Sequence, residues 1–426
     1  MFFFLPAVVL ALTNVERLFE AYLDRYGWDL GPEEREDAFS TFSMRLKKHG
    51  AEDAKDLDHL AELVTHTDGR ATYGLTSYFA FNKLPTGYLK PTHTYIDVDP
   101  STGAQTEKPC THSFHRPDPF PVIEDTPPSV DLRELGLLGS VLDQGSCGSC
   151  WAHGSAASLE SSVRSTRHLF KDNPDVDPLF KDPEFVASAQ YIMNNSRTNN
   201  NYCEGGNYEY VSVDYANGVL DTVESRKNFP LTSDRTGVNP PYIEPAQTHL
   251  TKLFSPFHTD GTKFNCNLSI IELFNIPSGK IIRMRDIQRL RSWLARGLAI
   301  PTLMNTQGGG PNGQISLGSY RSGILDYPCQ QPGVFDHQVV YVGYGKFHGV
   351  DVWLLRNSWG EDWGLRGFFM TPVRGNSFCT ETAAYIDVPK YYDFALNGTA
   401  YQRQADASTY WDDYVRRDTE AGFDSD

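Results

Sequence analysis

The chain has 426 residues, of which 40% are hydrophobic and 22% charged, which is enough for two or three soluble domains with a full-sized core. Its 38 basic and 54 acidic residues give a formal net charge of −16. This acidic balance excludes the basic footprint of a nucleic-acid-binding protein and argues against docking on anionic membranes. We therefore expect no nucleic-acid partner and no stable membrane insertion.

The N-terminus carries a short apolar run over residues 2–12. It is too short to span a bilayer and is typical of the core of a signal peptide, although the usual basic residues before it are missing. We predict a signal peptide over residues 1–13; the alternative is the start of a buried helix. The seven cysteines and three Asn-X-Ser/Thr triplets, at Asn194, Asn267 and Asn397, agree with a secretory route and with glycosylation.

Three further regions follow in chain order. Residues 14–90 are charged and helical in pattern, and we expect them to form a separate N-terminal domain. Eight prolines between residues 91 and 128 favour an exposed, extended linker over residues 91–126 that is easily cut. The main domain then spans residues 127–388, and residues 389–426 form a polar, acidic tail.

The main domain changes pattern from helix to strand. Apolar residues at helical spacing predict helices over residues 150–163, from residue 182 onward, and over residues 286–295 before Gly297. After about residue 300, short runs rich in Val, Tyr and Trp alternate with glycines, which is typical of strands. The sequence therefore predicts an α+β fold with a helical half before a β half.

Residues 143–152 read DQGSCGSCWA and contain the most informative cysteine. Gly145 and Gly148 make a tight loop that opens into the helix from Cys150. A thiol at a helix N-terminus lies in a positive field, which favours the nucleophilic thiolate. The backbone N–H of Cys150 and the side chain of Gln144 are then placed to stabilise a developing oxyanion.

Two later segments supply a candidate base and its partner. His337 begins the run HQVVYVGY, and Asn357 follows the run WLLR. The two residues are symmetric about residue 347, and residues 345–349 have the composition of a turn, so a hairpin centred there would bring both side chains face to face. An Asn that accepts the imidazole N–H leaves the other ring nitrogen for the thiol.

Each of these residues also has a purely structural interpretation. A single Cys is most often a small buried side chain or half of a disulfide, and a single His or Asn on a strand is most often structural. The combination of a helix-start Cys, an upstream Gln, and a His and Asn on paired strands favours catalysis instead.

These segments resemble the signatures of the papain and cathepsin family of cysteine proteases, residues 144–152 its nucleophile motif and residues 336–337 and 357–360 its histidine and asparagine boxes. The resemblance implies a two-domain fold in which a helical domain carries the cysteine, a β-barrel-like domain carries the histidine, and the active-site cleft lies between them. It implies a peptidase that works through a thioester, and an endopeptidase because no cleft-blocking histidine pair is visible. It implies no metal and no organic cofactor. The catalytic residues that it assigns are Cys150 as nucleophile, His337 as acid–base, Asn357 as orienting residue and Gln144 as oxyanion donor.

The same resemblance assigns binding positions and disulfides. The glycine backbone of the loop after Cys203 would pair with an extended peptide substrate. The substrate-binding residues would be Gly205, Gly206, Tyr208, Asp336 and Trp359. The disulfides would be Cys147–Cys203 and Cys329–Cys379. Cys110 and Cys266 are left over, and they either bond to each other and tether the N-terminal region to the main domain or remain buried thiols.

Residues 73–80 resemble the family's inhibitory propeptide motif, with Ala80 in place of its closing acid. The resemblance therefore implies that residues 14–90 are a prodomain that inhibits the chain's own peptidase domain. We expect a monomeric zymogen whose partners are this propeptide and peptide or protein substrates. It would reach a lysosome-like or vacuole-like acidic compartment or the cell exterior.

The chain departs from the family pattern in a few places. His153 stands where an aromatic residue is usual, and Gln338 stands where a small residue is usual and is expected in the S2 pocket. The spacing from Cys150 to His337 exceeds the usual value of about 130–150 residues, which predicts insertions. Three alternatives stay open: an exopeptidase of the same fold, another Cys-His-Asn acyl-transfer enzyme such as a transglutaminase or amidase, and a non-catalytic peptide-binding module.

Overall fold

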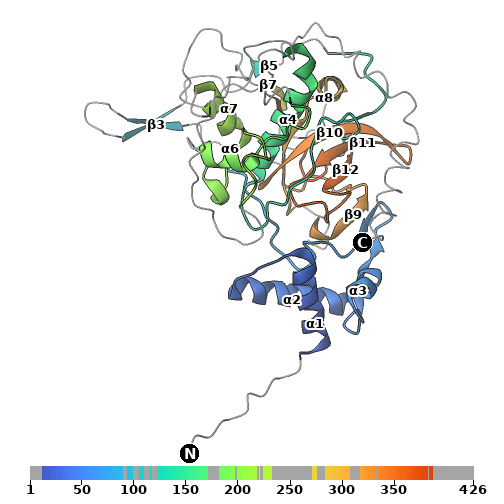
Figure 1. Cartoon of the computed structure of the whole chain (residues 1–426). Helices are drawn as coiled ribbons and strands as arrows, with labels where there is room; N and C mark the ends of the chain where they lie inside the picture. Colours follow the sequence, from blue (N-terminus) through green and yellow to red (C-terminus); the bar gives the residue numbers. More distant parts are fainter. Residues whose placement is uncertain are drawn as a thin grey trace, which may run out of the picture.

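The structure is a computed structural model (Figure 1). It describes residues 12–89, 94–98, 105–109, 116–117, 122–170, 182–196, 199–217, 220, 224–232, 271–275, 284–307, 317–331, 333–381 and 383–386. Across these ranges, no helix combines the length and the hydrophobicity that a membrane span requires. The predictions on the tail, on Asn267 and Asn397, and on the pairing of Cys110 with Cys266 lie outside the described residues, as does most of the signal peptide.

Three helices form the N-terminal unit, α1 (Asn14–Tyr26), α2 (Pro32–His49) and α3 (Leu57–Val64). Thr13, which we placed at the end of the signal peptide, is the N-cap of α1 and makes a capping box with Glu16. The apolar faces of the helices pack on one another through buried aromatic side chains. Figure 1 shows this unit in blue at one end of the molecule, apart from the sheet-rich body.

The N-terminal unit also joins the main domain through a sheet. Strand β1 (His66–Thr67) pairs with β2 (Ala71–Tyr73), and β2 pairs antiparallel with β9 (Tyr320–Gly323). The η2 turn (Leu317–Ser319) precedes β9, and the carbonyl of Ser319 accepts the N–H of Gly74 at 2.8 Å. These pairings dock residues 66–74 onto the edge of the main domain.

The first half of the main domain is helical, as predicted. It contains α4 (Cys150–Phe170), α6 (Ala189–Asn195), η1 (Tyr202–Glu204) and α7 (Tyr208–Asn217). The predicted apolar face of α4 is buried in a core of its own, made with α6 and α7. The predicted helix start at residue 182 is wrong, because α6 begins only at Ala189, where the Ser188 side chain accepts the N–H of Tyr191 as a cap.

The second half is a sheet, also as predicted. Its strands are β8 (Ile300–Met304), β10 (His337–Phe347), β11 (Val350–Arg356), β12 (Phe368–Pro372), β13 (Ala383–Ile386), β7 (Ile271–Asn275), β5 (Arg116–Pro117) and β6 (Val130–Asp131). The order is β12-β11-β10-β8-β13-β7-β5, with β6 also paired to β10. Helix α8 (Met284–Ala295) packs against β10. The described strands form an open path, so the expected barrel is not closed by the part of the chain that is described.

The proline-rich linker contributes secondary structure as well as extended chain. Strand β3 (Thr94–Val98) pairs with β4 (Gln105–Pro109) in a hairpin that projects from the body in Figure 1. Further on, β5 pairs parallel with β7 at the end of the large sheet. Pro117 is tolerated in β5 because β5 lies at the edge of the sheet. Proline has no backbone N–H to donate, and an edge strand has one side without a neighbouring strand.

Candidate active site

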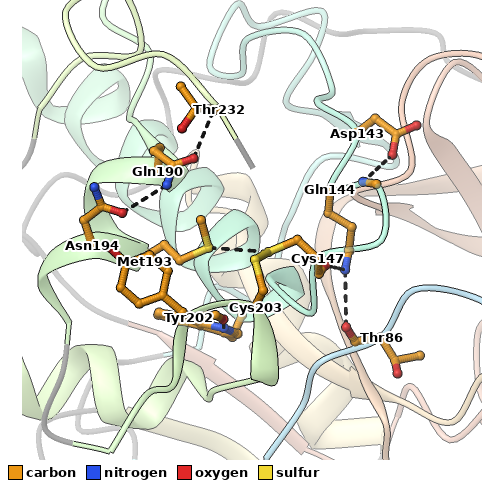
Figure 2. Close-up of a disulfide and its surroundings, with 12 residues drawn as sticks. Thr86, Asp143, Gln144, Cys147, Gln190, Met193, Asn194, Tyr202, Cys203 and Thr232 are labelled. Carbon is orange, nitrogen blue, oxygen red and sulfur yellow. Dashed lines mark hydrogen bonds between the residues drawn. A yellow bond between two sulfur atoms is a disulfide. The ribbon is translucent and has the colours of Figure 1, made fainter. Parts of the chain in front are cut away.

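Cys150 is the first residue of α4 and is the free cysteine among the described residues. The loop before it is fastened to the loop of Cys203 by the predicted Cys147–Cys203 disulfide (Figure 2). Gly148 is required here because a Cβ would lie 2.4 Å from the carbonyl oxygen of Cys203. The second predicted disulfide, Cys329–Cys379, is also present in the β half. These contacts fix where α4 begins and therefore where the thiol lies.

His337 and Asn357 form a buried pair. The His337 Nε2 and the Asn357 Oδ1 are 2.8 Å apart, and the same oxygen accepts the N–H of Ser358 at 2.8 Å. Because an amide oxygen accepts only, Nε2 carries the ring proton and Nδ1 is left as the basic nitrogen. The Trp359 ring stacks on the imidazole with centroids 5.1 Å apart, which covers the hydrogen bond between His337 and Asn357.

The contact between His337 and Asn357 was predicted, but the predicted strand register is wrong. The turn lies at His348 and Gly349, both with positive φ, and Phe347 pairs with Val350. The Cα partner of His337 is Met304 on β8. The register shifts between residues 341 and 343, and Asn357 lies just beyond the end of β11. The side chain of Asn357 therefore reaches His337 from a position where the chain has already left the sheet. The two residues are not paired across the β10–β11 ladder.

Gln144 is held at the same site by three contacts. Its Oε1 accepts the hydroxyl of Ser358, and its Nε2 donates to the carbonyls of Cys147 at 2.8 Å and Thr86 at 3.3 Å. Figure 2 shows the amide of Gln144 directed toward Thr86. Ser358 was missed in the sequence, because a serine after the catalytic Asn carries no pattern that points to Gln144.

The cleft is occupied by residues 85–89 of the chain itself. The N–H groups of Gly87 and Tyr88 donate to the carbonyl of Asp336 at 3.0 and 3.1 Å. Gly206 exchanges two hydrogen bonds with this segment, its N–H to the carbonyl of Gly87 and its carbonyl from the N–H of Leu89, both at 2.8 Å. The bridge between Tyr88 and Gly206 is parallel. The sequence offered no pattern that placed this segment in the cleft.

All five predicted substrate-binding residues lie around this segment. Gly206 and Asp336 bind its backbone, and Trp359 donates its indole N–H to the carbonyl of Pro85 at 3.1 Å. A Cβ on Gly205 would lie 2.9 Å from the carbonyl oxygen of Gly87. The Tyr88 ring packs in an apolar cluster with Tyr208, Leu303 and Phe335. The Asp336 carboxylate is itself held by the N–H and hydroxyl of Thr306, at 2.8 and 2.7 Å.

Burial decides the protonation of the covered site. It raises the pKa of the Cys150 thiol to about 12, against hydrogen bonds from backbone N–H groups that lower it. Burial also lowers the pKa of His337, against the hydrogen bond that its Nε2 donates to Asn357, which raises the pKa. Burial therefore opposes the thiolate that the helix-start position of Cys150 favours, and it also opposes the imidazolium form of His337.

Two other sequence-based expectations are corrected by the structure. Asn194 lies within α6 and is 1% exposed, which argues against the glycan predicted there. Gln338 is not part of the apolar cluster around Tyr88; its side chain packs toward Gly154 of α4 and lines a cavity with His153. His153 and Gln338, the two residues that depart from the family pattern near the active site, therefore line the same cavity.

Comparison with known proteins agrees with this geometry. The profile of the papain family cysteine proteases matches residues 126–387. The chain belongs to the papain family. Cysteine proteinase COT44 from Brassica napus is 27% identical over 249 residues, which are 58% of this chain and 60% of that protein. The oryzain gamma chain from Oryza sativa subsp. japonica is 30% identical over 259 residues, 59% of this chain and 57% of that protein.

The matched region of this papain-family chain thus spans about 60% of the length of the curated relatives. A digestive procathepsin L 3 from the larval midgut of Tenebrio molitor has the same fold, with a TM-score of 0.55 and 17% identity, and it covers 88% of this chain and 99% of its own. The predicted α+β papain-like fold with an N-terminal prodomain is confirmed.

Proposed function

We propose that the protein is the zymogen of a cysteine peptidase, and that Cys150, His337, Asn357 and Gln144 carry its reaction. The observation that carries the proposal is the Asn357–His337 pair, which leaves Nδ1 as the free basic nitrogen of a buried imidazole. Gln144, held between Ser358 and the loop of Cys147, is the second support, because its N–H is directed at a carbonyl in the cleft.

The reaction follows from these positions. The Sγ of Cys150 attacks the carbonyl carbon of a peptide bond while Nδ1 of His337 holds the thiol proton. The negative charge on the carbonyl oxygen is stabilised by the N–H of Cys150 and the amide of Gln144. When the C–N bond breaks, His337 gives its proton to the leaving amine and a thioester remains. Water then attacks the thioester with His337 as base, which releases the acid and restores the thiol.

We infer that the chain's own residues 85–89 inhibit this reaction in the precursor. They occupy the backbone groups of Gly206 and Asp336, and Cys150 is 0% exposed in this closed form. Cleavage within residues 91–126 would release the prodomain and open the cleft. We propose that this activation takes place on the secretory route, in an acidic compartment or outside the cell. The active enzyme would cleave internal peptide bonds of peptide and protein substrates.

The test uses the full precursor and its Cys150→Ser variant. Incubation at acidic pH is expected to convert the wild-type protein to a shorter form that hydrolyses unblocked and end-blocked peptides, whereas the variant stays intact and inactive. Addition of a primary amine separates hydrolysis from acyl transfer, because a transglutaminase or amidase-type enzyme would give the amide of the added amine. Wild-type and Cys150→Ser proteins with equal activity would end the proposal.

A further inference from the structure

A small polar cavity adjoins the catalytic pair between α4 and the β10–β11 hairpin. Its volume is about 10 Å³. The residues that line it include His153 and Gly154 of α4, Gln338 of β10, Arg356 of β11 and the catalytic Asn357. A cavity of about 10–15 Å³ is the smallest that holds a water molecule.

Polar atoms in the wall of this cavity have no protein partner within the described part of the chain. They are His153 Nε2, both polar atoms of the Gln338 side chain, Arg356 Nη1 and Asn357 Nδ2, and all of them are buried. Gln338 is 2% and Asn357 3% exposed, so bulk water does not supply the missing bonds. A buried polar group without a partner costs stability, and native proteins usually pair such groups through an ordered water.

Four of these five atoms match one water molecule, and only Gln338 Nε2 has no bond to it. Arg356 Nη1 and Asn357 Nδ2 donate only, and the water oxygen accepts two bonds. The Gln338 Oε1 accepts, and the Nε2 of a neutral His153 accepts as well. Burial, and next the charge of Arg356, hold the pKa of His153 well below its usual range, with His337 and Arg226 acting in the same direction.

The positive charge of Arg356 beside the cavity is compensated in part by a buried carboxyl. Arg356 interacts with the buried carboxyl of Glu160 and donates through Nη2 to the carbonyl of Ser140 at 3.0 Å. Glu160 in turn lies 3.5 Å from Arg164 and accepts the N–H of Gly139. Arg356 shares the carboxyl of Glu160 with Arg164 and Arg226, so an anion in the cavity is the alternative that the crystal test below distinguishes from water.

We propose that this cavity binds one structural water, and that His153 and Gln338 are positioning residues that act through this water on Asn357. The role in catalysis rests on the proposed function, whereas the water site does not. The Oδ1 of Asn357 holds the imidazole of His337, and its Nδ2 is the other end of the same planar amide. A bond from Nδ2 to the water fixes the amide plane and with it the acceptor for His337. In this chain, His153 and Gln338 stand where the family pattern has an aromatic and a small side chain. They would thus hold the Asn357 amide through hydrogen bonds to the water in place of apolar packing.

The first test is a high-resolution crystal structure of the processed wild-type enzyme grown with bromide in place of chloride. We expect one water within hydrogen-bond distance of Asn357 Nδ2 and His153 Nε2. A bromide at this position, identified by its anomalous signal, or a cavity closed by side chains would overturn the proposal. This readout is independent of activity, so it separates the failure of the water site from the failure of the proposed peptidase function.

The second test compares His153→Phe, which keeps the ring but removes the acceptor, with His153→Gln, which keeps a polar end. His153→Phe is expected to lower kcat about tenfold at unchanged KM, and His153→Gln to stay within about threefold of wild type. The alkaline limb of kcat/KM should move to lower pH in His153→Phe only, because the Asn357 amide is then held less firmly as the acceptor that stabilises the charged form of His337. Because His153 is neutral, its replacement by Phe removes no charge. A shift of the alkaline limb would therefore not come from a change in the electrostatic potential at His337.

A purely structural role of His153 would lower the melting temperature of His153→Phe without moving the alkaline limb, and that result would overturn the catalytic part of the proposal. If His153→Phe does not fold, Gln338→Leu removes the other partner of the water and serves as the replacement. It is expected to give the same drop in kcat and the same shift of the alkaline limb, and wild-type values for both would count against the positioning role.

Discussion

Replacing Gly87 with valine tests whether residues 85–89 are the segment that shuts the active site. In the precursor, a Cβ at Gly87 would lie 2.1 Å from the carbonyl oxygen of Gly148 and 2.4 Å from its carbonyl carbon. Both atoms belong to the backbone of the loop before Cys150, so they do not move aside at little cost. The Gly87→Val segment must therefore leave its place in the cleft.

The free energy of closure that Gly87→Val removes can be estimated from the backbone hydrogen bonds that hold residues 85–89 in the cleft. Four of them, to the backbone of Asp336 and Gly206, are 2.8 to 3.1 Å long. With about 0.5–1.5 kcal/mol for each hydrogen bond, the loss of most of them weakens closure by about 2–4 kcal/mol. Since about 1.4 kcal/mol is a factor of ten, the population of open precursor should rise roughly 30- to 700-fold.

The assay is the rate at which a small thiol reagent alkylates Cys150 in the intact precursor at neutral pH, followed by mass spectrometry. Cys150 is 0% exposed in the closed form, so its labelling rate reports the open population. Gly31→Ala is the matched control, because a Cβ there meets only the side chain of Glu34 at an ordinary 3.8 Å. Equal labelling rates for wild type and Gly87→Val, with both precursors folded by circular dichroism, would refute the assignment of this segment.

Two other predictions concern catalysis and acid release. Cys150→Ser should abolish peptide hydrolysis in a folded protein, and Gln144→Ala should lower kcat by about 10²–10³, as for the loss of one oxyanion donor; an unchanged kcat in Gln144→Ala would remove it from the oxyanion site. The pKa of His49 is lowered by burial and then by His66, Lys48 and Arg45, so below its usual value of about 6.5 an opened prodomain binds a proton more readily than the closed one. Acid therefore weakens closure, and His49→Gln should shift the midpoint of processing to lower pH. The comparison variant is His59→Gln on α3, which is half-buried as His49 is and should not shift it; equal midpoints in both variants would contradict the role of His49.

Local sequence signals predicted the chemistry-bearing residues well. The apolar spacing after Cys150 predicts α4, and the core that buries it confirms this face. The glycines before Cys150 predict a tight loop, and Gly148 indeed has no room for a side chain. The two disulfides and the pairing of His337 with Asn357 followed from the family resemblance and from the residue types, and both are present.

These local signals did not predict where helix α6 begins or how strands β10 and β11 pair. The helix predicted from residue 182 failed because the local pattern is the same for a turn that leads into a capped helix at Ser188. The predicted register of β10 on β11 failed because the turn lies at His348 and Gly349 and not around residue 347, and a further shift occurs near Val342, whose carbonyl accepts the N–H of Leu132 at 3.0 Å. Such a shift has no period in the sequence.

The sequence by itself determined which groups we propose for the reaction, because a nucleophile at a helix start, a histidine and an asparagine are chosen by their chemistry and by short-range spacing. Tertiary structure alone decided the state of those groups. Burial raises the pKa of Cys150, residues 85–89 occupy the cleft from more than 60 positions earlier in the chain, and the partner of β2 is a strand about 250 residues later. His153 and Gln338, which the sequence marks as two separate departures from the family pattern, share one cavity only because α4 packs on β10. Burial and contact between distant segments arise from packing of the whole chain, and no local pattern encodes them.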